Sequence, residues 1–439
     1  MHLLPHQQNH AAHLVAAIKE HRAALDASDP GTGKTYVACA VAAKLGLPVV
    51  IITPKATIPS WEAVAAGFGV RTLLVTNYEK IRTGRMGECR RFGGRYTWYL
   101  PDSALIIFDE CQKCKGRDSL NAALLIAARR QHFRILLCSA TAASNPLEMR
   151  AIGFTLGLHA LHDFYSWAKR HGVVEGFFGL EYKGRPEHIA AIHNAIFPRR
   201  GHRMRIAEIV DFPDTVVESA LIETGKAKAI QREYDRLRAE LHKAERAGDD
   251  DTLQTIADKT RARRANSMTI TLRARQAIEL YKVDSMVELA RNGMEEGMSV
   301  VLLVNFTATS IALSEKLDCP HIISGGQSDA ERQAHIEAFQ ANRAPFIIVN
   351  IQAGGAGISL HDPQGIRPRL SIISPTFSAT DLKQALGRVH RNGGAASIQK
   401  ICFAAGTCEE HTAKSCAEKI AHIDLLNDGD MQPFPISLH

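Results

Sequence analysis

The chain has 439 residues, of which 45% are hydrophobic and 23% are charged. This composition excludes a mainly disordered protein, and the length predicts two or more domains. The 53 basic and 46 acidic residues leave a net charge of +7, which favours a polyanionic partner. No apolar run approaches the ~18 residues of a membrane span, and the N-terminus lacks the basic and apolar segments of a signal peptide. Nine scattered cysteines favour reduced thiols in a cytosolic compartment. The compact size without added tails favours a bacterial or phage-infected cell over a eukaryotic nucleus.

Short apolar runs alternate with segments of helical spacing in both halves of the chain. This rhythm is typical of parallel sheets with crossover helices, so it predicts two α/β domains. The predicted strands of the first half are residues 49–52, 72–75, 105–108 and 135–138. Those of the second half are residues 300–304, 321–323, 346–349, 370–373 and 398–403.

The segment from Ser28 to Thr35 reads S-D-P-G-T-G-K-T and precedes a predicted helix at residues 36–44. Glycines of this pattern let backbone N–H groups turn around phosphate oxygens, the lysine approaches the β- and γ-phosphates, and the threonine hydroxyl can bind Mg²⁺. The strict phosphate-loop pattern has glycine where this chain has Ser28. The residues expected to hold the nucleotide are Gly31, Thr32, Gly33, Lys34 and Thr35.

Two adjacent acids, Asp109 and Glu110, follow the predicted strand at residues 105–108. A nucleotide site needs a carboxylate that holds Mg²⁺, and Asp109 is expected to do so together with Thr35. Glu110 is then placed to activate the attacking water as a general base. The alternative is a strand that ends in solvated acids, which the nearby phosphate-loop pattern makes less favourable.

Two patterns that could suggest a metal site are interpreted structurally. Cys111 and Cys114 form a C-x-x-C pair, but no second pair completes a zinc site, so we expect free thiols at a helix start. His6, His10 and His13 share one face of a predicted helix, but no acid or cysteine completes a ligand set there.

Residues 226–246 carry apolar side chains at alternating three- and four-residue steps, with charges between them. This spacing predicts an amphipathic helix, and Gly248 and the aspartates at 249–251 mark its end and the start of another. A helical pair packed on a neighbouring domain is the simpler interpretation, and a dedicated binding device is the alternative.

Taken together, these motifs resemble superfamily 2 nucleic-acid motors and, within them, Swi/Snf-like ATPases. The resemblance extends from about Leu3 to about Arg391, nearly the whole chain. Gln112 stands where the commonest family motif has a coupling histidine. The motifs that carry the resemblance are L-L-P-H-Q at 3–7, I-T-P-K at 52–55, D-E-C-Q at 109–112, S-A-T at 139–141, the paired-arginine linker F-P-R-R-G-H-R-M at 197–204, D-F-P at 211–213, N-F-T at 305–307, I-Q-A-G-G-A-G-I at 351–358 and Q-A-L-G-R-V-H-R at 384–391.

The resemblance also implies roles for individual residues. Arg388 and Arg391 lie three apart on an expected helix, so as arginine fingers they would project from one face toward the γ-phosphate. The catalytic set is then Lys34, Asp109, Glu110, Gln384, Arg388 and Arg391, and Gln7 and Gly357 join the phosphate loop in binding ATP. The implied nucleic-acid contacts are Lys55, Arg82, Thr141, Thr307 and Gly354; a basic stretch, Arg85, Arg90, Arg91 and Arg95, is a further candidate whose alternative is a solvated loop.

The fold implied by the resemblance is α/β, with two RecA-like parallel-sheet domains in tandem and helical protrusions. The expected divisions are a first domain at 1–157, a helical protrusion and linker at 158–213, and a second domain at 214–439 with a helical insertion at about 226–290. The implied function is a DNA-dependent ATPase that uses ATP and Mg²⁺ and moves along double-stranded DNA as a monomer, or with only transient association. A strand-separating DNA or RNA helicase and an ATP-gated nucleic-acid clamp with slow hydrolysis are the alternatives.

Overall fold

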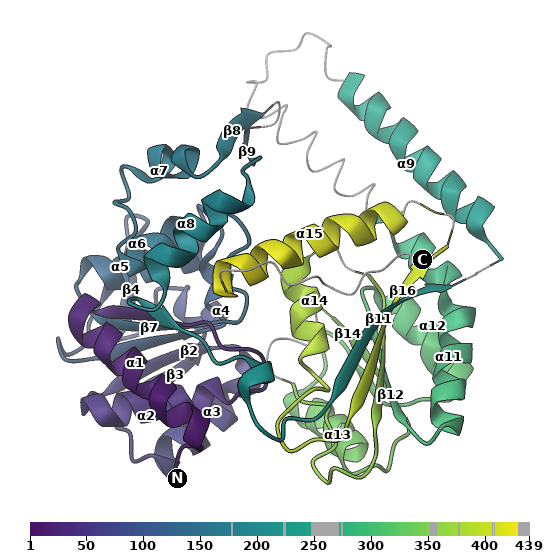
Figure 1. Cartoon of the computed structure of the whole chain (residues 1–439), viewed down its shortest axis with the longest axis horizontal. Helices are drawn as coiled ribbons and strands as arrows, with labels where there is room; N and C mark the ends of the chain where they lie inside the picture. The colour runs from purple at the N-terminus through teal and green to yellow at the C-terminus, as the bar shows by residue number, and fades with distance from the viewer. Residues whose placement is uncertain are drawn as a thin grey trace. The chain divides into compact units, whose positions relative to one another are not determined.

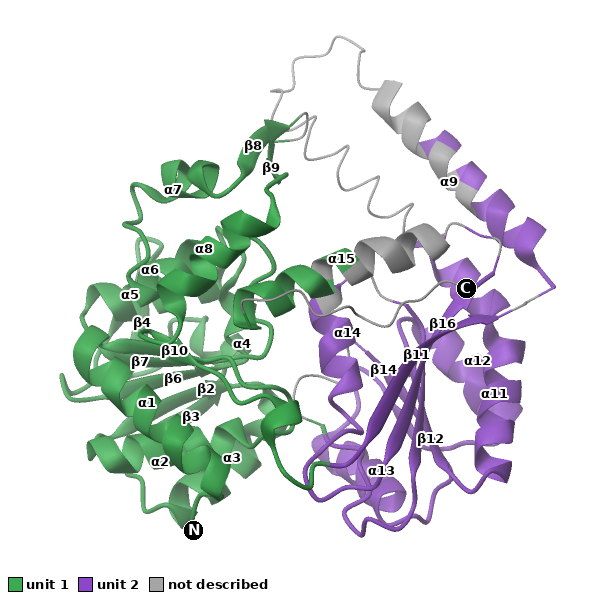
Figure 2. Cartoon of the chain, in the orientation of Figure 1, with its two compact units in different colours: residues 1–212, 355–358, 418–434 green, residues 213–354, 359–417, 435–439 purple. Residues whose placement is uncertain are grey.

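The computed structural model describes residues 1–428 except 177–178, 223–224, 247–271, 274, 352–357, 376–377, 406 and 408. The chain divides into two compact units (Figure 2). Unit 1 contains Met1–Phe212 and, from the far end of the chain, a segment that begins at Glu418. Unit 2 contains Pro213–Gly354 and Ser359–Ala417. The expected helix ends at Gly248 and at 249–251 fall outside the described residues.

Unit 1 is built on a six-stranded sheet in the order β10-β1-β7-β6-β2-β3, and every pairing in it is parallel. The carboxyl ends of parallel strands meet at one edge of a sheet, which is where open α/β sheets bind ligands. The strands are β1 (Ala23–Asp26), β2 (Val49–Thr53), β3 (Thr72–Asn77), β6 (Leu105–Asp109), β7 (Arg134–Cys138) and β10 (Gly201–His202).

Both faces of this sheet are buried, which is why its strands read as continuous apolar runs rather than alternating ones. In β2, Val50 and Ile52 belong to one core cluster while Val49 and Ile51 belong to the other. Helices α1 (Pro5–His21), α2 (Lys34–Leu45) and α3 (Ile58–Gly67) pack in the second cluster, as the grouping in Figure 1 shows. The first cluster contains residues of α4 (Tyr78–Ile81), α5 (Leu120–Arg130), α6 (Arg150–Leu156), α7 (Phe164–Arg170) and α8 (Pro186–Ile196).

Unit 1 also carries two antiparallel hairpins, β4 (Cys89–Phe92) with β5 (Arg95–Trp98) and β8 (Val173–Gly176) with β9 (Gly179–Tyr182). The second hairpin lies between α7 and α8 in the sequence, within the segment expected to be a helical protrusion. The 3-10 helices of the unit are η1 (Lys55–Thr57), η2 (Cys111–Cys114), η3 (Pro146–Met149) and η4 (Ile206–Glu208).

Unit 2 has a second parallel sheet, in the order β11-β16-β15-β12-β14-β13. Its strands are β11 (Thr215–Ile222), β12 (Ser299–Val304), β13 (Ile322–Ile323), β14 (Phe346–Asn350), β15 (Arg369–Ile373) and β16 (Ser397–Ala404). The helices that follow in the chain are α9 (Ala227–Arg246), α11 (Val283–Glu295), α12 (Thr307–Leu317), α13 (Asp329–Gln340), α14 (Ala379–Leu386) and α15 (Glu409–Asp428). None of the helices within the described ranges is both long and apolar enough to cross a bilayer.

These observations confirm the predicted α/β class, because each strand expected from an apolar run is a strand of one of the two parallel sheets. The strands β1, β10 and β11 were not expected. The four residues of β1 include two alanines, and β10 has only two residues. Neither produces an apolar run long enough to stand out in the sequence.

Candidate nucleotide-binding site

The phosphate loop, residues 28–35, connects the end of β1 to the start of α2. Gly31 and Gly33 both have positive φ, at 85° and 90°, in the left-handed region that favours glycine. A Cβ atom at position 33 would also lie 2.4 Å from Nε2 of Gln7. Glycine at position 33 is therefore favoured by its backbone conformation, and a larger residue there would also displace the side-chain amide of Gln7.

Gln7 is buried and ties α1 to this loop. Its Nε2 donates a hydrogen bond of 2.9 Å to the carbonyl of Thr32, and its Oε1 accepts one of 3.0 Å from the backbone N–H of Leu4. The sequence prediction gave Gln7 a role in contacting the base of ATP, which stays a prediction. The contact that the structure adds is with the phosphate loop itself.

Lys34, the first residue of α2, folds back over the loop. Its Nζ donates hydrogen bonds of 2.8 and 3.0 Å to the carbonyls of Ser28 and Asp29. The hydroxyl of Thr32 donates a further bond of 2.8 Å to the carbonyl of Asp29. The loop is thus closed on itself around the lysine that is expected to meet phosphate.

Ser28 occupies the position where the strict pattern has glycine, and its side chain explains the difference. The Ser28 hydroxyl is fully buried, lies 3.2 Å from Nε2 of His10 and accepts a hydrogen bond from the N–H of Met204. His10 also forms an ion pair of 3.1 Å with Asp26 at the end of β1. The serine therefore joins the first turn of the loop to α1 and to the segment after β10.

His10 belongs to a small cluster with His13 and His202, in which Nδ1 of His10 lies 2.7 Å from Nδ1 of His202 and the ring of His13 stacks on that of His202. Within the described ranges, no group of three or more metal-ligating side chains is arranged to hold a metal ion. Burial acts to raise the pKa of Asp26, but the charge and hydrogen bond of His10 and the charge of Lys34 outweigh it, so the pKa is lowered.

The histidine cluster gives a pH dependence that can be measured. Burial first, and then the charges of His10 and His13, lower the pKa of His202 to about 4, although Asp26 acts in the opposite direction. The unfolded chain takes up this proton near pH 6.5 whereas the folded chain does not, so stability is expected to fall as the pH drops from about 6.5 to about 4. The midpoint of thermal unfolding should therefore decline over this window, and less steeply in His202→Gln. His2→Gln, at an exposed position, is the control and should keep the wild-type slope.

Asp109 is the last residue of β6, and its carboxylate is held on both oxygens. Oδ2 accepts hydrogen bonds from the hydroxyl of Thr53 at 2.7 Å and from Nε1 of Trp61 at 2.9 Å. Oδ1 accepts one of 3.0 Å from the N–H of Glu110. Burial and the neighbouring charge of Glu110 raise the pKa of Asp109 to about 6.

Glu110 follows directly with φ of 51°, an uncommon backbone conformation for a residue other than glycine. Its Oε2 accepts a hydrogen bond of 2.5 Å from Nε2 of Gln112, which is itself buried. Gln112, the residue that departs from the family motif, therefore orients the carboxylate proposed as the general base.

The residues present fit a bound Mg²⁺. Asp109 and Thr35 offer a carboxylate and a hydroxyl, the hard oxygen ligands that this ion prefers. Lys34 begins α2 beyond the carboxyl end of β1, and Asp109 ends β6 of the same parallel sheet, so both lie at the carboxyl edge of that sheet. A carboxylate whose pKa is raised by burial and a neighbouring acid is stabilised when a cation approaches.

Two aromatic side chains near Asp109 were not assigned to this site from the sequence. Trp61 is 1% exposed and donates its N–H to Asp109. Tyr78 was not singled out; its hydroxyl donates a hydrogen bond of 2.6 Å to the carbonyl of Asp109. Cys111 and Cys114 are buried free thiols in η2, as predicted, and burial raises the pKa of Cys114 to about 12.

The predicted nucleic-acid contacts of unit 1 lie in different environments. Lys55 and Arg82 are exposed, the first directly after β2 and the second at the end of α4. Thr141 is 1% exposed, beyond the end of β7. In unit 2, Thr307 is the first residue of α12. Gly354 falls outside the described residues, as does Gly357 of the expected ATP contacts.

One expectation about unit 2 is wrong. Gln384 lies in α14 as expected, but that helix ends at Leu386, so Arg388 and Arg391 follow it instead of sharing a helical face. Gly387 is the C-cap of the helix, and the N–H of Arg388 donates to the carbonyl of Ala385 at 3.1 Å, three residues back, instead of continuing the helical pattern. Arg388 is 3% exposed. Arg391 lies near His361. Burial of His361, followed by the charges of Arg391 and Arg369, lowers the pKa of that histidine to about 4.

Comparisons with known proteins agree with this geometry. Residues 281–393 match the family described as helicase conserved C-terminal domain. The chain is 30% identical over 466 residues to a protein of Acanthamoeba polyphaga mimivirus named putative ATP-dependent RNA helicase L364. The alignment covers 98% of this chain and 84% of that protein. Solved structures with a similar fold include S. cerevisiae Dbp5 bound to RNA and ADP BeF3, with TM-score 0.51, 12% identity and coverage of 96% and 92%. The search of solved structures also matches the Sulfolobus solfataricus SWI2/SNF2 ATPase core in complex with dsDNA, at a TM-score of 0.38, 17% identity and coverage of 98% and 94%.

The two parallel-sheet units, with a phosphate loop on the first, define a tandem RecA-like ATPase. The chain belongs to the helicase family, within the helicase-like ATPases of superfamily 2. It is accordingly an enzyme that hydrolyses ATP, and its activity is of the nucleic-acid-dependent kind. The predicted superfamily and the predicted fold class are both confirmed.

Proposed function

We propose that this enzyme is a DNA-dependent ATPase that translocates along double-stranded DNA. The observation that supports the ATPase step is the convergence of Lys34 and Asp109 at the carboxyl edge of one sheet. The linker at residues 197–204 resembles the paired-arginine linker of Swi/Snf-like ATPases, and this resemblance supports duplex DNA as the track.

In this proposal each residue of unit 1 has a separate task. Lys34 leaves the carbonyls of Ser28 and Asp29 and donates to the β- and γ-phosphates, and the N–H groups around Gly31 and Gly33 surround the phosphate oxygens. Asp109 and Thr35 would hold Mg²⁺, which supplies charge neutralisation at the phosphates. Glu110, oriented by Gln112, accepts a proton from the attacking water.

The residues of unit 2 complete the proposed mechanism. We assign Arg388 and Arg391 to the charge that develops on the γ-phosphate, a role worth about 10³–10⁵ in rate in related enzymes. Gln384 and Gly357 are assigned to the same nucleotide. Because the two sets of residues belong to separate units, hydrolysis would be coupled to a change between open and closed arrangements of the units, and hence to stepping.

Backbone contacts suit a motor that must accept any sequence. We assign such contacts to Lys55, Arg82, Thr141, Thr307 and Gly354. The hairpin of β4 and β5 adds Arg85, Arg90, Arg91 and Arg95, all exposed. Arg90 and Arg91 stack against Tyr99 and Tyr96, with 5.7 and 5.5 Å from guanidinium carbon to ring centroid, which holds the two cations at the surface.

The hairpin assignment predicts a change in salt dependence. Arg90→Gln with Arg91→Gln should weaken binding to duplex DNA and reduce the slope of log K against log salt by about 2, because each lost phosphate contact removes about 0.9. Fluorescence anisotropy with labelled DNA over a salt series measures both. Arg71→Gln is the matched control, since Arg71 is exposed but lies outside the hairpin, directly before β3. A slope equal to that of the control would remove the hairpin from the interface.

A strand-separating helicase is the second candidate, and the name of the mimivirus relative favours it. An assay with a forked duplex distinguishes the translocase from the helicase. A translocase displaces a bound protein or a third strand without separating the duplex, whereas a helicase releases the displaced strand.

We further propose that the enzyme acts as a monomer or associates transiently, in the cytoplasm of a bacterial or phage-infected cell. The buried free thiols of the described residues are in keeping with a reducing compartment.

A further inference from the structure

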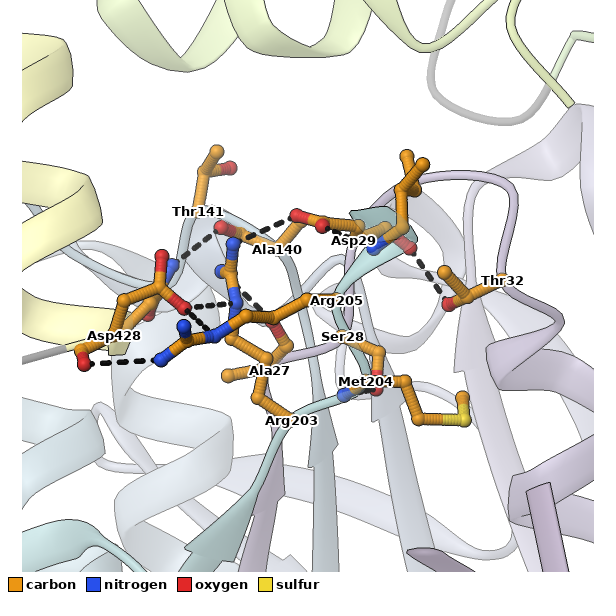
Figure 3. Close-up of polar contacts among 12 residues, drawn as sticks. Ala27, Ser28, Asp29, Thr32, Ala140, Thr141, Arg203, Met204, Arg205 and Asp428 are labelled. Carbon is orange, nitrogen blue, oxygen red and sulfur yellow. Dashed lines mark hydrogen bonds and ion pairs between the residues drawn. The ribbon is translucent and has the colours of Figure 1, made fainter. Parts of the chain in front are cut away.

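The last turn of α15 meets the segment that follows β10, although more than 200 residues separate them in the chain (Figure 3). Oδ1 of Asp428 forms ion pairs of 2.7 Å with Nε of Arg203 and 2.9 Å with Nε of Arg205. The carbonyl of Asp428 accepts a further hydrogen bond of 3.2 Å from Arg205. The side chains of Asp428 and Arg203 are 6% and 8% exposed, so this pair lies away from solvent.

The segment that Asp428 holds is in turn bound to the phosphate loop. Arg203 donates a hydrogen bond of 2.8 Å to Oδ1 of Asp29, and the N–H of Ile206 donates one of 3.0 Å to Oδ2. The N–H of Asp29 donates to the carbonyl of Met204 at 3.1 Å. Arg203 also donates to the carbonyl of Ala27, just before the loop. Both oxygens and the N–H of Asp29 are thus fixed by three residues of the segment 203–206.

Asp29 also contacts the two residues of the loop, Thr32 and Lys34, that are expected to bind phosphate. Its carbonyl accepts the hydrogen bonds from Nζ of Lys34 and from the hydroxyl of Thr32. A continuous series of polar contacts therefore joins Asp428, through Arg203 and Asp29, to Lys34.

The same end of α15 is anchored in unit 1 by three other contacts. Nδ2 of Asn427 donates a hydrogen bond of 2.8 Å to the carbonyl of Ala140, directly after β7. Nδ1 of His193 lies 2.9 Å from the carbonyl of Leu426, and Leu425 and Leu426 are buried in the core of unit 1. These contacts fix the position from which Asp428 acts.

We propose that Asp428 is a positioning residue for ATP binding, which holds the phosphate loop in its binding conformation through Arg203 and Asp29. A buried ion pair is weak support for stability as such, but removing one partner leaves the other charge buried and uncompensated. Without Asp428, Arg203 and Arg205 repel each other beside the loop, and Asp29 loses the fixed guanidinium that sets its orientation. ATP must then order the loop as it binds, which weakens its affinity.

The test compares equilibrium binding of a fluorescent ATP analogue with steady-state kinetics in Asp428→Asn. We expect the Kd and the KM for ATP to rise by about three- to tenfold, while kcat at saturating ATP and the affinity for DNA stay within about twofold of wild type. Asp428→Glu should recover part of the affinity, because it restores the charge. Glu208→Gln is the control, since Glu208 also pairs with Arg205, at 3.8 Å, but is 63% exposed.

Arg205→Gln gives a second measurement should Asp428→Asn fold poorly. Arg205 is 40% exposed, so its loss should leave the fold intact and raise the Kd by about two- to threefold. An unchanged Kd for ATP in both variants would overturn the proposal, as would a rise in Asp428→Asn that Asp428→Glu does not reduce. The inference rests on the proposed ATP site, and Lys34→Ala separates the two: normal binding in Lys34→Ala contradicts the site, whereas loss there with normal binding in Asp428→Asn contradicts the positioning role alone.

Discussion

Replacing Glu110 by glutamine is expected to leave ATP bound and slow its hydrolysis by about 10²–10⁴-fold, the usual contribution of a positioned general base. The substitution keeps the shape of the side chain and its place after β6, but an amide cannot accept the proton of the attacking water. Since Lys34 and Asp109 are untouched, the affinity for ATP should stay near the wild-type value. Single-turnover hydrolysis and filter binding of labelled ATP measure the two quantities separately.

Asp118→Asn is the matched control for this experiment, because it removes a carboxylate that is 89% exposed. Its hydrolysis rate should equal that of wild type. Hydrolysis at the normal rate in Glu110→Gln would show that another group activates the water and that Gln112 orients a carboxylate without a catalytic role.

Lys34→Ala should weaken ATP binding by about 10- to 100-fold, the factor that corresponds to losing a charge-assisted hydrogen bond. Turnover should be lost as well, because the same charge supports the γ-phosphate during transfer. In the structure Nζ of Lys34 contacts two carbonyls of its own loop, so the variant also loses the closure around which the loop is built. Isothermal titration with ATP and a coupled ATPase assay measure both effects.

Lys44→Ala is the matched control, because Lys44 lies in the last turn of the same helix and is exposed. It changes the charge of α2 equally without touching the loop, so its Kd should equal that of wild type. An equal and large loss in both variants would indicate damage to α2 and not to a phosphate site.

The sequence was most informative where local rules decide the structure. A run of buried apolar residues ended by Asp109 predicted both β6 and the acid at its carboxyl end. The glycines at 31 and 33 predicted the phosphate loop, since few other sequences adopt two positive φ angles so close together. In each case the residues that set the conformation are neighbours in the chain.

Contacts between distant segments were not predictable in this way. α14 ends at Leu386, and the carbonyl of Arg388 then accepts a hydrogen bond from the N–H of Leu360, which lies 28 positions earlier in the chain. Similarly, no local pattern indicates that the N–H of Trp61 reaches Asp109 across 48 positions of sequence. The contact of Asp428 with Arg203 spans the greatest sequence distance of these, and no local pattern at either end marks it.

The departure at Ser28 shows how a motif can be kept by other means. The missing glycine is replaced by a side chain that turns inward to His10 and to the N–H of Met204. His10 would otherwise have been counted among the scattered N-terminal histidines. Asp26 could have indicated the role of His10, because an acid at the end of a buried strand requires a polar partner.

The central claim, that ATP hydrolysis is driven by duplex DNA, is tested most directly by the ATPase rate measured in parallel without nucleic acid and with single-stranded DNA, duplex DNA and RNA. We expect the largest stimulation with duplex DNA and little with RNA. A rate that none of the nucleic acids changes, or one that RNA raises while duplex DNA does not, would contradict it.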